Sequence, residues 1–278
     1  MKHIILTRFN VLMPGWNSQI NLDPKWLDGR FSLFEDICLP SVASQKNQHF
    51  DWLVFFDSKT PAKYKEKINS LVKTYAFRPI YVDIFDLNEI SVNIFKDYSG
   101  DNMLLSSRLD SDDVLSIDYV EKVNSIASKR HSKCVINFDN GAILFSKNSK
   151  RLLYQYEDKS NPFTSLLEPC TADLTTILAV KHTELHAFAE VVHIKGKPMW
   201  LQVVHGGNVS NRVRGTRVKI NQFNDDFIYM QSISRDIVES DFAVLFDNVV
   251  LGTYRKLRDI IRSILKHIYL YVKKKQHP

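Results

Sequence analysis

Three apolar runs of the sequence each end at a charged residue, and this recurrence most constrains the fold. The runs occupy residues 2–7, 51–56 and 104–109, and they are followed by Arg8, Asp57 and Asp110. Segments with helical spacing separate them, at residues 29–45 and 61–74. Strands that alternate with helices form a largely parallel sheet with crossover helices. Because ligands bind at the carboxyl edge of such sheets, we expect the three charged residues to converge on one site.

Further elements are expected along the chain. A strand is predicted at residues 79–84 and a helix at 114–128, with Asp113 as its N-cap. In the second half, Asp139-Asn140-Gly141 is typical of a tight turn. That turn predicts a hairpin of strands 134–138 and 142–145. Additional strands are expected at 152–156, 174–181 and 199–204.

The acidic stretch after the run at 104–109 is the first candidate site. Asp110 and Asp112 lie two residues apart, so on an extended backbone their side chains leave the same face. Carboxylate oxygens suit Mg²⁺ or Mn²⁺, and such ions commonly bridge phosphate groups. Asp112 or Asp113 would also suit a cap of the helix that follows. The position of these acids after a buried strand favours a metal-assisted site for a substrate that carries a diphosphate.

Composition excludes several classes of protein. The 278 residues suffice for one large domain. The cysteines Cys38, Cys134 and Cys170 are far apart and form no CxxC pair, which argues against a disulfide framework or zinc site and fits a reducing compartment. The N-terminal apolar run is too short for a signal peptide. No stretch approaches the roughly 20 apolar residues of a membrane span.

The positive charge is concentrated at the C-terminus. The chain carries a net charge of +6, but residues 255–278 contain eight basic residues and one acid, or +7, which leaves −1 for the rest. A nucleic-acid-binding protein would carry its basic patch on the folded domain, so no nucleic-acid partner is expected. Leu257, Ile261 and Ile264 lie on one side of a predicted helix, with Arg258 and Arg262 opposite. This pattern favours attachment to an anionic membrane. The alternative is a helix packed on the domain or on a second subunit, with its basic face in solvent.

Taken in order, these segments resemble a GT-A glycosyltransferase, and more narrowly the bacterial family described as "putative rhamnosyltransferase". The resemblance covers roughly residues 1–215. The segments that carry it are Thr7-Arg8-Phe9-Asn10, residues 34–41 with Gln45, residues 51–57, Ser107-Arg108-Leu109-Asp110-Ser111-Asp112-Asp113, Asn161-Pro162-Phe163 and residues 200–208. It implies a Rossmann-like, mostly parallel central sheet flanked by helices in a domain of residues 1–215. An amphipathic helical extension of residues 216–278 would follow.

The resemblance also implies a nucleotide-sugar donor, linked to UDP or dTDP, and a divalent metal. Asp110 and Asp112 match the DxD motif, which in GT-A enzymes contacts the donor ribose and the metal-bound diphosphate. Both are therefore expected at the metal, with Asp112 as the first choice for the direct ligand. His205 matches a histidine that completes the coordination in several GT-A enzymes; a structural histidine is the alternative. The remaining residues expected at the donor are Thr7, Arg8, Phe9, Asp57 and Arg108. Arg8 and Arg108 would bind the diphosphate, and Phe9 would either stack on the base or pack in the core.

Transfer with inversion needs a base for the acceptor hydroxyl, and Glu168 is the candidate, with Asp139 and His182 as rivals. The expected acceptor is a glycan or lipid-linked glycan of surface-polysaccharide synthesis. The enzyme would then be cytoplasmic and peripheral on the inner face of the membrane. Three alternatives stay open: a phosphatase with Asp110 as nucleophile, a non-catalytic nucleotide- or glycan-binding module, and a nucleotidyltransferase.

Overall fold

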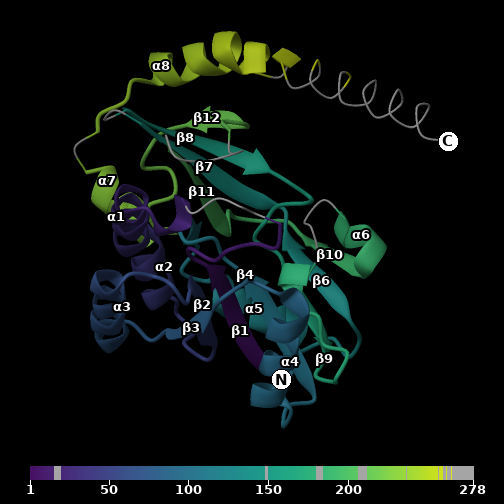
Figure 1. Cartoon of the computed structure of the whole chain (residues 1–278). Coiled ribbons are helices and arrows are strands. Elements are labelled where there is room, and N and C mark those ends of the chain that lie inside the picture. The colour runs from purple at the N-terminus through teal and green to yellow at the C-terminus, as the bar shows by residue number, and fades with distance from the viewer. Residues whose placement is uncertain are drawn as a thin grey trace, which may run out of the picture.

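Two sheets form the centre of the molecule (Figure 1). The computed structural model describes residues 1–15, 20–147, 150–179, 184–205, 212–235, 237–255, 257, 258, 261 and 264. Within these residues one sheet has seven strands and the other has five. Helices cover the larger sheet on both faces, which gives the three-layer α/β arrangement expected from the alternating pattern.

The larger sheet carries the predicted parallel core. Its strands are β1 (Lys2–Arg8), β2 (Asp51–Asp57), β3 (Arg78–Val82), β4 (Met103–Arg108), β6 (Cys134–Phe138), β9 (Ser165–Pro169) and β10 (Glu190–Ile194). They lie in the order β10-β6-β9-β4-β1-β2-β3. Strand β9 pairs antiparallel with both β4 and β6, and all other pairings are parallel. The expectation of a mostly parallel central sheet is therefore confirmed.

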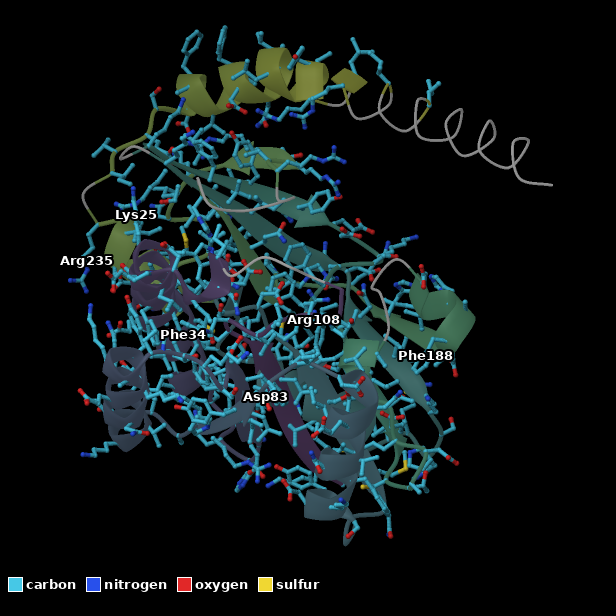
Figure 2. All side chains as sticks on the ribbon, viewed as in Figure 1. Lys25, Phe34, Asp83, Arg108, Phe188 and Arg235 are labelled. Carbon is cyan, nitrogen blue, oxygen red and sulfur yellow. The ribbon has the colours of Figure 1, made fainter. Side chains whose placement is uncertain are left out.

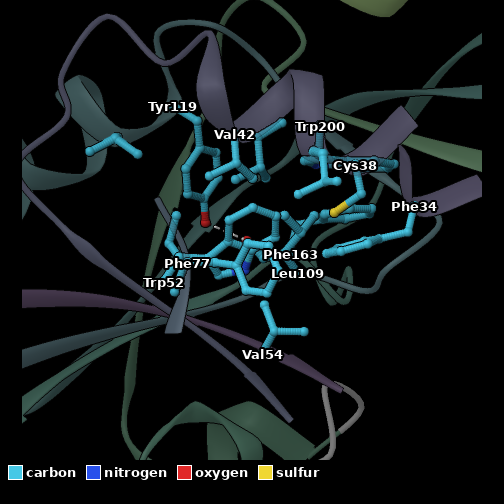
Figure 3. Close-up of a cluster of buried hydrophobic side chains, with 14 of the residues drawn as sticks. Phe34, Cys38, Val42, Trp52, Val54, Phe77, Leu109, Tyr119, Phe163 and Trp200 are labelled. Carbon is cyan, nitrogen blue, oxygen red and sulfur yellow. Dashed lines mark hydrogen bonds between the residues drawn. The ribbon is translucent and has the colours of Figure 1, made fainter. Parts of the chain in front are cut away.

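Alternation along β1 assigns its side chains to two cores. Ile5 packs with α1 (Pro24–Leu33), α2 (Leu39–Ala43), α3 (Ala62–Thr74) and α5 (Tyr119–Ala127), in the cluster shown in part in Figure 3. A π-helical turn, Phe34–Cys38, joins α1 to α2. Ile4 and Leu6 point to the opposite face, where they pack with α4 (Leu87–Tyr98) and α6 (Leu185–Phe188). Burial of the strands on both faces explains their continuous apolar runs.

The smaller sheet has the order β12-β8-β7-β11-β5. Its strands are β5 (Val114–Leu115), β7 (Asn140–Lys147), β8 (Lys150–Glu157), β11 (Trp200–Val204) and β12 (Thr216–Val218). Helix α7 (Ile228–Ile233) packs on it through Met230 and Ile233. Strand β12 begins one residue after the predicted domain boundary at 215 and pairs with β8, so the chain just beyond that boundary belongs to this sheet.

The predicted hairpin at Asp139-Asn140-Gly141 is wrong. Strand β6 belongs to the larger sheet and β7 to the smaller one, so the chain passes between sheets at this point. The glycine is required for a close approach, because a Cβ atom on Gly141 would lie 2.1 Å from the Trp200 ring. A turn-forming composition cannot distinguish a hairpin from a crossing, since both need a residue without a bulky side chain.

Two other expectations differ from the structure, and one helix was not expected. The predicted helix at 114–128 begins only at Tyr119, because Val114–Leu115 pairs with β11 as strand β5. The described part of the predicted strand 174–181 instead contains a 3-10 turn, Ile177–Ala179, and residues 180 and 181 lie outside the described residues. Helix α4 was not predicted at all.

After α7 the chain continues through α8 (Asp241–Phe246) into a second π-helical segment, Asp247–Leu251. Figure 1 shows this helix along the outer side of β12 and β8. None of the helices in the described residues combines the length and apolarity needed to cross a bilayer.

Candidate functional site

The site lies where β1 and β4 end side by side at the carboxyl edge of the larger sheet. Leu6 is opposite Arg108 in the parallel register, and the Leu109 amide donates to the Leu6 carbonyl at 3.1 Å. This pairing brings Arg8 next to Asp110, as the strand pattern predicted. Arg108 lies near the middle of the molecule (Figure 2). The edge therefore opens onto the region between the two sheets.

Asp110 is held as a carboxylate by arginines. The Arg108 Nη2 atom lies 3.2 Å from Asp110 Oδ2. Burial opposes ionisation of Asp110, but the charges of Arg108 and then Arg8 outweigh it and lower its pKa. Asp110 is consequently ionised at neutral pH and fixed in orientation by its neighbour.

Asp112 contacts a histidine from a distant part of the chain. Its Oδ2 atom lies 3.0 Å from His205 Nε2 and 3.4 Å from Arg30 Nη1. The side chain is only 8% exposed, so both contacts are made in a partly desolvated environment. The structure thus places Asp112 in contact with His205, two of the three residues (with Asp110) that the family resemblance assigns to a metal.

Asp113 does not cap a helix. Its Oδ1 atom accepts a hydrogen bond from the Val203 amide at 2.8 Å, which ties the acidic stretch to β11 two residues before His205. Burial, followed by the charges of Asp112 and Asp110, raises the pKa of Asp113 well above its usual range. Asp113 therefore favours its neutral form and positions the strand that carries His205.

Three guanidinium groups gather around the acidic stretch at this edge. Arg8, Arg30 and Arg108 all interact electrostatically with Asp110. Arg108 contacts the Asp110 carboxylate, and Arg30 contacts that of Asp112. Such a site suits an anionic ligand, and a divalent cation would add to its attraction for a diphosphate.

Asp112 and His205 form a hydrogen-bonded pair whose oxygen and nitrogen are also the donor types that divalent metals bind. Neighbouring ligand atoms in an octahedral Mg²⁺ site with bonds of about 2.1 Å lie about 3.0 Å apart, and the Asp112 Oδ2 to His205 Nε2 distance is 3.0 Å. Within the described residues, no group of three or more His, Cys, Asp and Glu side chains is arranged to hold a metal. Further ligands would have to come from the substrate and water, as is usual for Mg²⁺ at phosphates.

A cavity of about 300 Å³ opens beside Asp110. Its lining includes Arg108, Tyr156, Asp158, Trp200 and Arg214. Arg214 donates to the Tyr156 hydroxyl at 3.2 Å, which orders one side of the cavity. The combination of aromatic rings, guanidinium groups and carboxylates is suited to a polar ligand with a flat apolar face, such as a sugar.

Asp158 is held firmly against the end of β6. Its amide donates to the Asp139 carbonyl at 2.8 Å, and its carbonyl accepts from the Asn161 side chain at 3.0 Å. One carboxylate oxygen accepts from the Ser160 amide at 2.9 Å. The Asn161-Pro162-Phe163 segment therefore serves to fix Asp158, which lines the cavity together with Asp110.

Two of the residues expected at the donor are instead structural. Thr7 is buried, and its hydroxyl accepts from the Trp52 indole at 2.9 Å. Phe9 is 3% exposed, and its ring lies 4.6 to 5.2 Å from those of Phe31, Phe34 and Phe56. A ring enclosed in this way cannot stack on a base, so core packing is its role.

The Asp57 carboxylate also has local partners. It accepts from the Lys59 amide at 2.8 Å and from the Asn21 side chain at 2.9 Å, and the residue is 2% exposed. As placed, Asp57 shapes the loops after β1 and β2 and does not line the cavity beside Asp110.

The expectation for Glu168 is corrected by its position. Glu168 is opposite Leu104 near the start of β4, at the other end of the strand from Asp110. It is 2% exposed, and its carboxylate accepts from the Thr175 hydroxyl at 2.9 Å and the Thr176 amide at 2.8 Å. Thr176 has a φ of 62°, so the carboxylate holds a strained turn.

Of the other two candidate bases, Asp139 and His182, the structure describes only Asp139. Asp139 is fully buried and is engaged by His193 at 2.8 Å and by Asn137 at 2.6 Å. His182 lies outside the described residues. Among the described residues, the carboxylates that line the cavity are those of Asp110 and Asp158.

Sequence reasoning missed Arg30 and Asp158. Arg30 lies in the last turn of α1, where a basic residue is normally solvated, and nothing in its local pattern points to Asp112. Asp158 carried a usable signal, because it follows a predicted strand and precedes Asn161-Pro162-Phe163. The predicted base, Glu168, follows this segment, whereas Asp158 precedes it.

Comparison with solved structures gives only distant likenesses. Residues 1–349 of S. aureus TarS show 10% identity over 73% of this chain and 60% of that one, with a TM-score of 0.41. The same fragment with UDP-GlcNAc shows 11% identity over 87% and 68%, with a TM-score of 0.43. A putative nucleotide-diphospho-sugar transferase from Desulfovibrio desulfuricans G20 shows 12% identity over 72% and 82%, with a TM-score of 0.32.

These structural likenesses are too weak to bear on function. Comparison with curated proteins found no significant match. The sequence itself matches the family described as "Putative rhamnosyl transferase" over residues 2–217, which include Arg8, Asp110, Asp112, Asp158 and His205. Because the match covers most of the chain, the protein belongs to this family of putative rhamnosyl transferases, which are glycosyltransferases by description.

Proposed function

We propose that the protein is a metal-dependent GT-A glycosyltransferase of bacterial surface-polysaccharide synthesis. It would move a rhamnose-like deoxysugar, a galactofuranose or a hexose from a UDP- or dTDP-linked donor to a glycan or lipid-linked glycan. The observation that carries the proposal is the contact between Asp112 and His205 at 3.0 Å, beside the cavity, in a chain of this family. All the proposed catalytic groups lie within residues 1–215, and residues 216–278 are proposed as an extension.

On the donor side, Asp112 and His205 would hold a Mn²⁺ or Mg²⁺ ion. The ion would act as a Lewis acid that stabilises negative charge on the departing diphosphate. Arg8 and Arg108 lie close enough to Asp110 to influence its ionisation, and they would donate charge-assisted hydrogen bonds to the same diphosphate. Asp110, fixed by Arg108, would accept a hydrogen bond from the donor ribose.

On the acceptor side, we assign the general base to Asp158. It lines the cavity together with Asp110, and its backbone is anchored by Asn161 and by the Asp139 carbonyl. An anchored carboxylate keeps a defined distance to a bound hydroxyl, which proton transfer requires. Trp200 and Tyr156 would pack against the apolar face of a sugar.

In the proposed transfer, the acceptor oxygen forms a bond to the anomeric carbon of the donor sugar while its proton passes to Asp158. The bond between the anomeric carbon and the diphosphate oxygen breaks, and the electron pair leaves with the nucleoside diphosphate. Attack from the side opposite the leaving group inverts the anomeric configuration.

A lipid-linked acceptor would require the enzyme to work at the inner face of the membrane as a peripheral protein. The basic character of residues 255–278 supports this location, because anionic lipids attract polybasic segments.

A thermal-shift panel of nucleotide sugars and nucleoside diphosphates, each with Mn²⁺, tests the proposal. Ligands that bind the folded state raise the unfolding temperature by mass action, so the donor should stand out in the wild type. The same ligand should give a much smaller shift with Asp112→Ala. If no nucleotide sugar or nucleoside diphosphate shifts the wild type, the proposal fails.

Activity assays with the ligands of the panel, together with a phosphomonoester and a nucleoside triphosphate, separate the alternatives. Donor binding without turnover, with Mn²⁺ and a range of acceptors, would favour a non-catalytic module. Hydrolysis of a phosphomonoester without any use of nucleotide sugars would favour a phosphatase with Asp110 as nucleophile. Transfer from a nucleoside triphosphate would favour a nucleotidyltransferase.

A further inference from the structure

The helix that starts at α8 is attached to the molecule by its polar side. Asn248 lies beside β12, where its side chain accepts from the Arg217 amide at 2.7 Å and donates to the Arg217 carbonyl at 2.9 Å. Asp247 is 8% exposed and pairs with Arg255 at 2.6 Å. The Arg255 guanidinium lies 4.8 Å from the centre of the Tyr154 ring in β8. The helix therefore uses its charged and amide side chains to bind the smaller sheet.

Its apolar side faces away from the protein. Side chains project from the outer side of this helix in Figure 2. Six of the apolar ones, at spacings of three, four and eight residues, are between 49% and 74% exposed: Phe242, Phe246, Val249, Leu257, Ile261 and Ile264. The spacing places them along one stripe, with the π-helical segment absorbing the change in register.

This arrangement is the reverse of an ordinary surface helix, which buries its apolar stripe and leaves its polar side in water. An exposed apolar stripe of this kind marks a surface that binds a membrane or another protein. The sequence alone predicted an amphipathic helix with Leu257, Ile261 and Ile264 on its apolar side. In the structure the exposed stripe starts at Phe242, well before the basic tail.

The charge of residues 255–278 indicates whether a lipid surface or a second copy of this chain covers the stripe. Residues 255–278 carry eight basic residues and one acid. Two copies that paired along this helix would bring these charges together, which is unfavourable. An anionic bilayer is complementary to them, and apolar side chains next to basic ones are typical of helices that lie in the membrane interface.

We infer that the outward stripe from Phe242 to Ile264 inserts into the interface of an anionic phospholipid bilayer. The polar attachment to β12 and β8 fixes the orientation of the protein on that surface. This inference deepens the proposed function, because it specifies how the enzyme would meet a lipid-linked acceptor. The membrane contact can nevertheless be measured without any donor or acceptor.

The test compares Phe242→Gln/Phe246→Gln with the full-length wild type by co-sedimentation with vesicles. The vesicles contain equal parts of phosphatidylglycerol and phosphatidylcholine, or phosphatidylcholine alone. Wild type should bind the anionic vesicles more strongly, and the double variant should bind them at least about tenfold more weakly. The matched control is Val92→Gln, which removes an exposed apolar side chain from α4, and it should bind like wild type.

Two results would overturn the inference. One is equal binding of wild type and the double variant to anionic vesicles, since the basic residues alone would then suffice. The other is a wild-type dimer in sedimentation velocity that the double variant converts to monomer, since the stripe would then be a subunit interface. Thermal shift with nucleotide sugars and Mn²⁺ should be unchanged in the double variant, so failure here is distinguishable from failure of the proposed function.

Discussion

The Oδ2 atom of Asp112 lies 3.0 Å from the Nε2 atom of His205, although 93 residues separate them in sequence. Strand β11 ends at Val204 and carries His205 to the acidic stretch, and Asp113 secures that approach through the Val203 amide at 2.8 Å. The two sheets thus meet where the larger one ends in carboxylates. A metal held there would be bound by both sheets at once.

The first prediction concerns this pair. Asp112→Asn and His205→Gln should each lower nucleoside-diphosphate affinity in Mn²⁺ by at least about 100-fold, the upper end of what loss of a supporting group costs a metal site. The double variant should be little worse than either single one, because the residues act through one ion. Titration calorimetry with and without Mn²⁺ measures this.

The exposed Asp173 provides a matched control for the loss of one carboxylate, and Asp173→Asn should bind like wild type. Additive losses in the Asp112 and His205 cycle would mean that the two side chains act independently, and the shared-metal assignment would be abandoned.

The second prediction separates a base from a buried structural acid. Asp158→Asn should lower kcat by about 100-fold or more, since general-base catalysis contributes about 10²–10⁴-fold, with little change in stability. Glu168→Gln should lower the free energy of unfolding by about 1.5–3 kcal/mol, because it weakens charge-assisted hydrogen bonds to Thr175 and Thr176. Initial rates and urea unfolding of both variants provide the comparison.

The opposite pattern, with a large kcat loss and normal stability for Glu168→Gln, would restore Glu168 as the base. Donor affinity should be retained in Asp158→Asn, because Asp158 is assigned to the acceptor side.

The parallel strands and their carboxyl-edge charges could be predicted from the sequence because they depend on local patterns. Continuous apolar runs identified β1, β2 and β4, and the parallel register then required Arg8 and Asp110 to be neighbours. The Asp112 and His205 pairing came from family resemblance, since no local pattern connects residues in different sheets.

The features that the sequence could not predict depend on which sheet a segment joins and on which side chains the packed molecule buries. Asp139-Asn140-Gly141 has the composition of a turn, but it serves as a crossing whose glycine makes room for Trp200. Phe9 and Glu168 have chemistry suited to ligands, and only their burial shows that they serve the core and a strained turn. Burial is a property of the packed molecule, so single-sequence reasoning over-assigned polar and aromatic residues to the site.

The third prediction follows from that crossing. Gly141→Ala should destabilise the protein by about 1–3 kcal/mol or more, since the added Cβ overlaps the Trp200 ring and forces repacking. Trp200 also stacks on Phe163 at 5.0 Å and lines the cavity, so sugar binding should weaken too. Urea unfolding and tryptophan fluorescence measure both effects.

Gly29→Ala is the control for replacing a glycine. Gly29 lies inside α1 with no atom within 4 Å of an added Cβ, so the change should be neutral or stabilise by up to about 1 kcal/mol. A Gly141→Ala variant as stable as wild type would show that the ring can move aside freely.

The fourth prediction is a pH dependence that arises from His3 in β1. Burial lowers the pKa of His3 from 6.5 to about 3, and its Nε2 atom lies 2.8 Å from the Ser107 hydroxyl. Between these values the unfolded chain binds a proton that the folded protein excludes, so stability falls as pH drops below about 6.5. At about pH 5 the loss should be about 2 kcal/mol. Urea unfolding of wild type and His3→Gln at about pH 7.5 and about pH 5 measures it.

Between these two pH values, the free energy of unfolding of His3→Gln should rise relative to that of wild type by the same amount. His49→Gln, a change at an exposed position, should show no such shift relative to wild type. An equal difference at both pH values would mean that His3 is protonated in the folded protein.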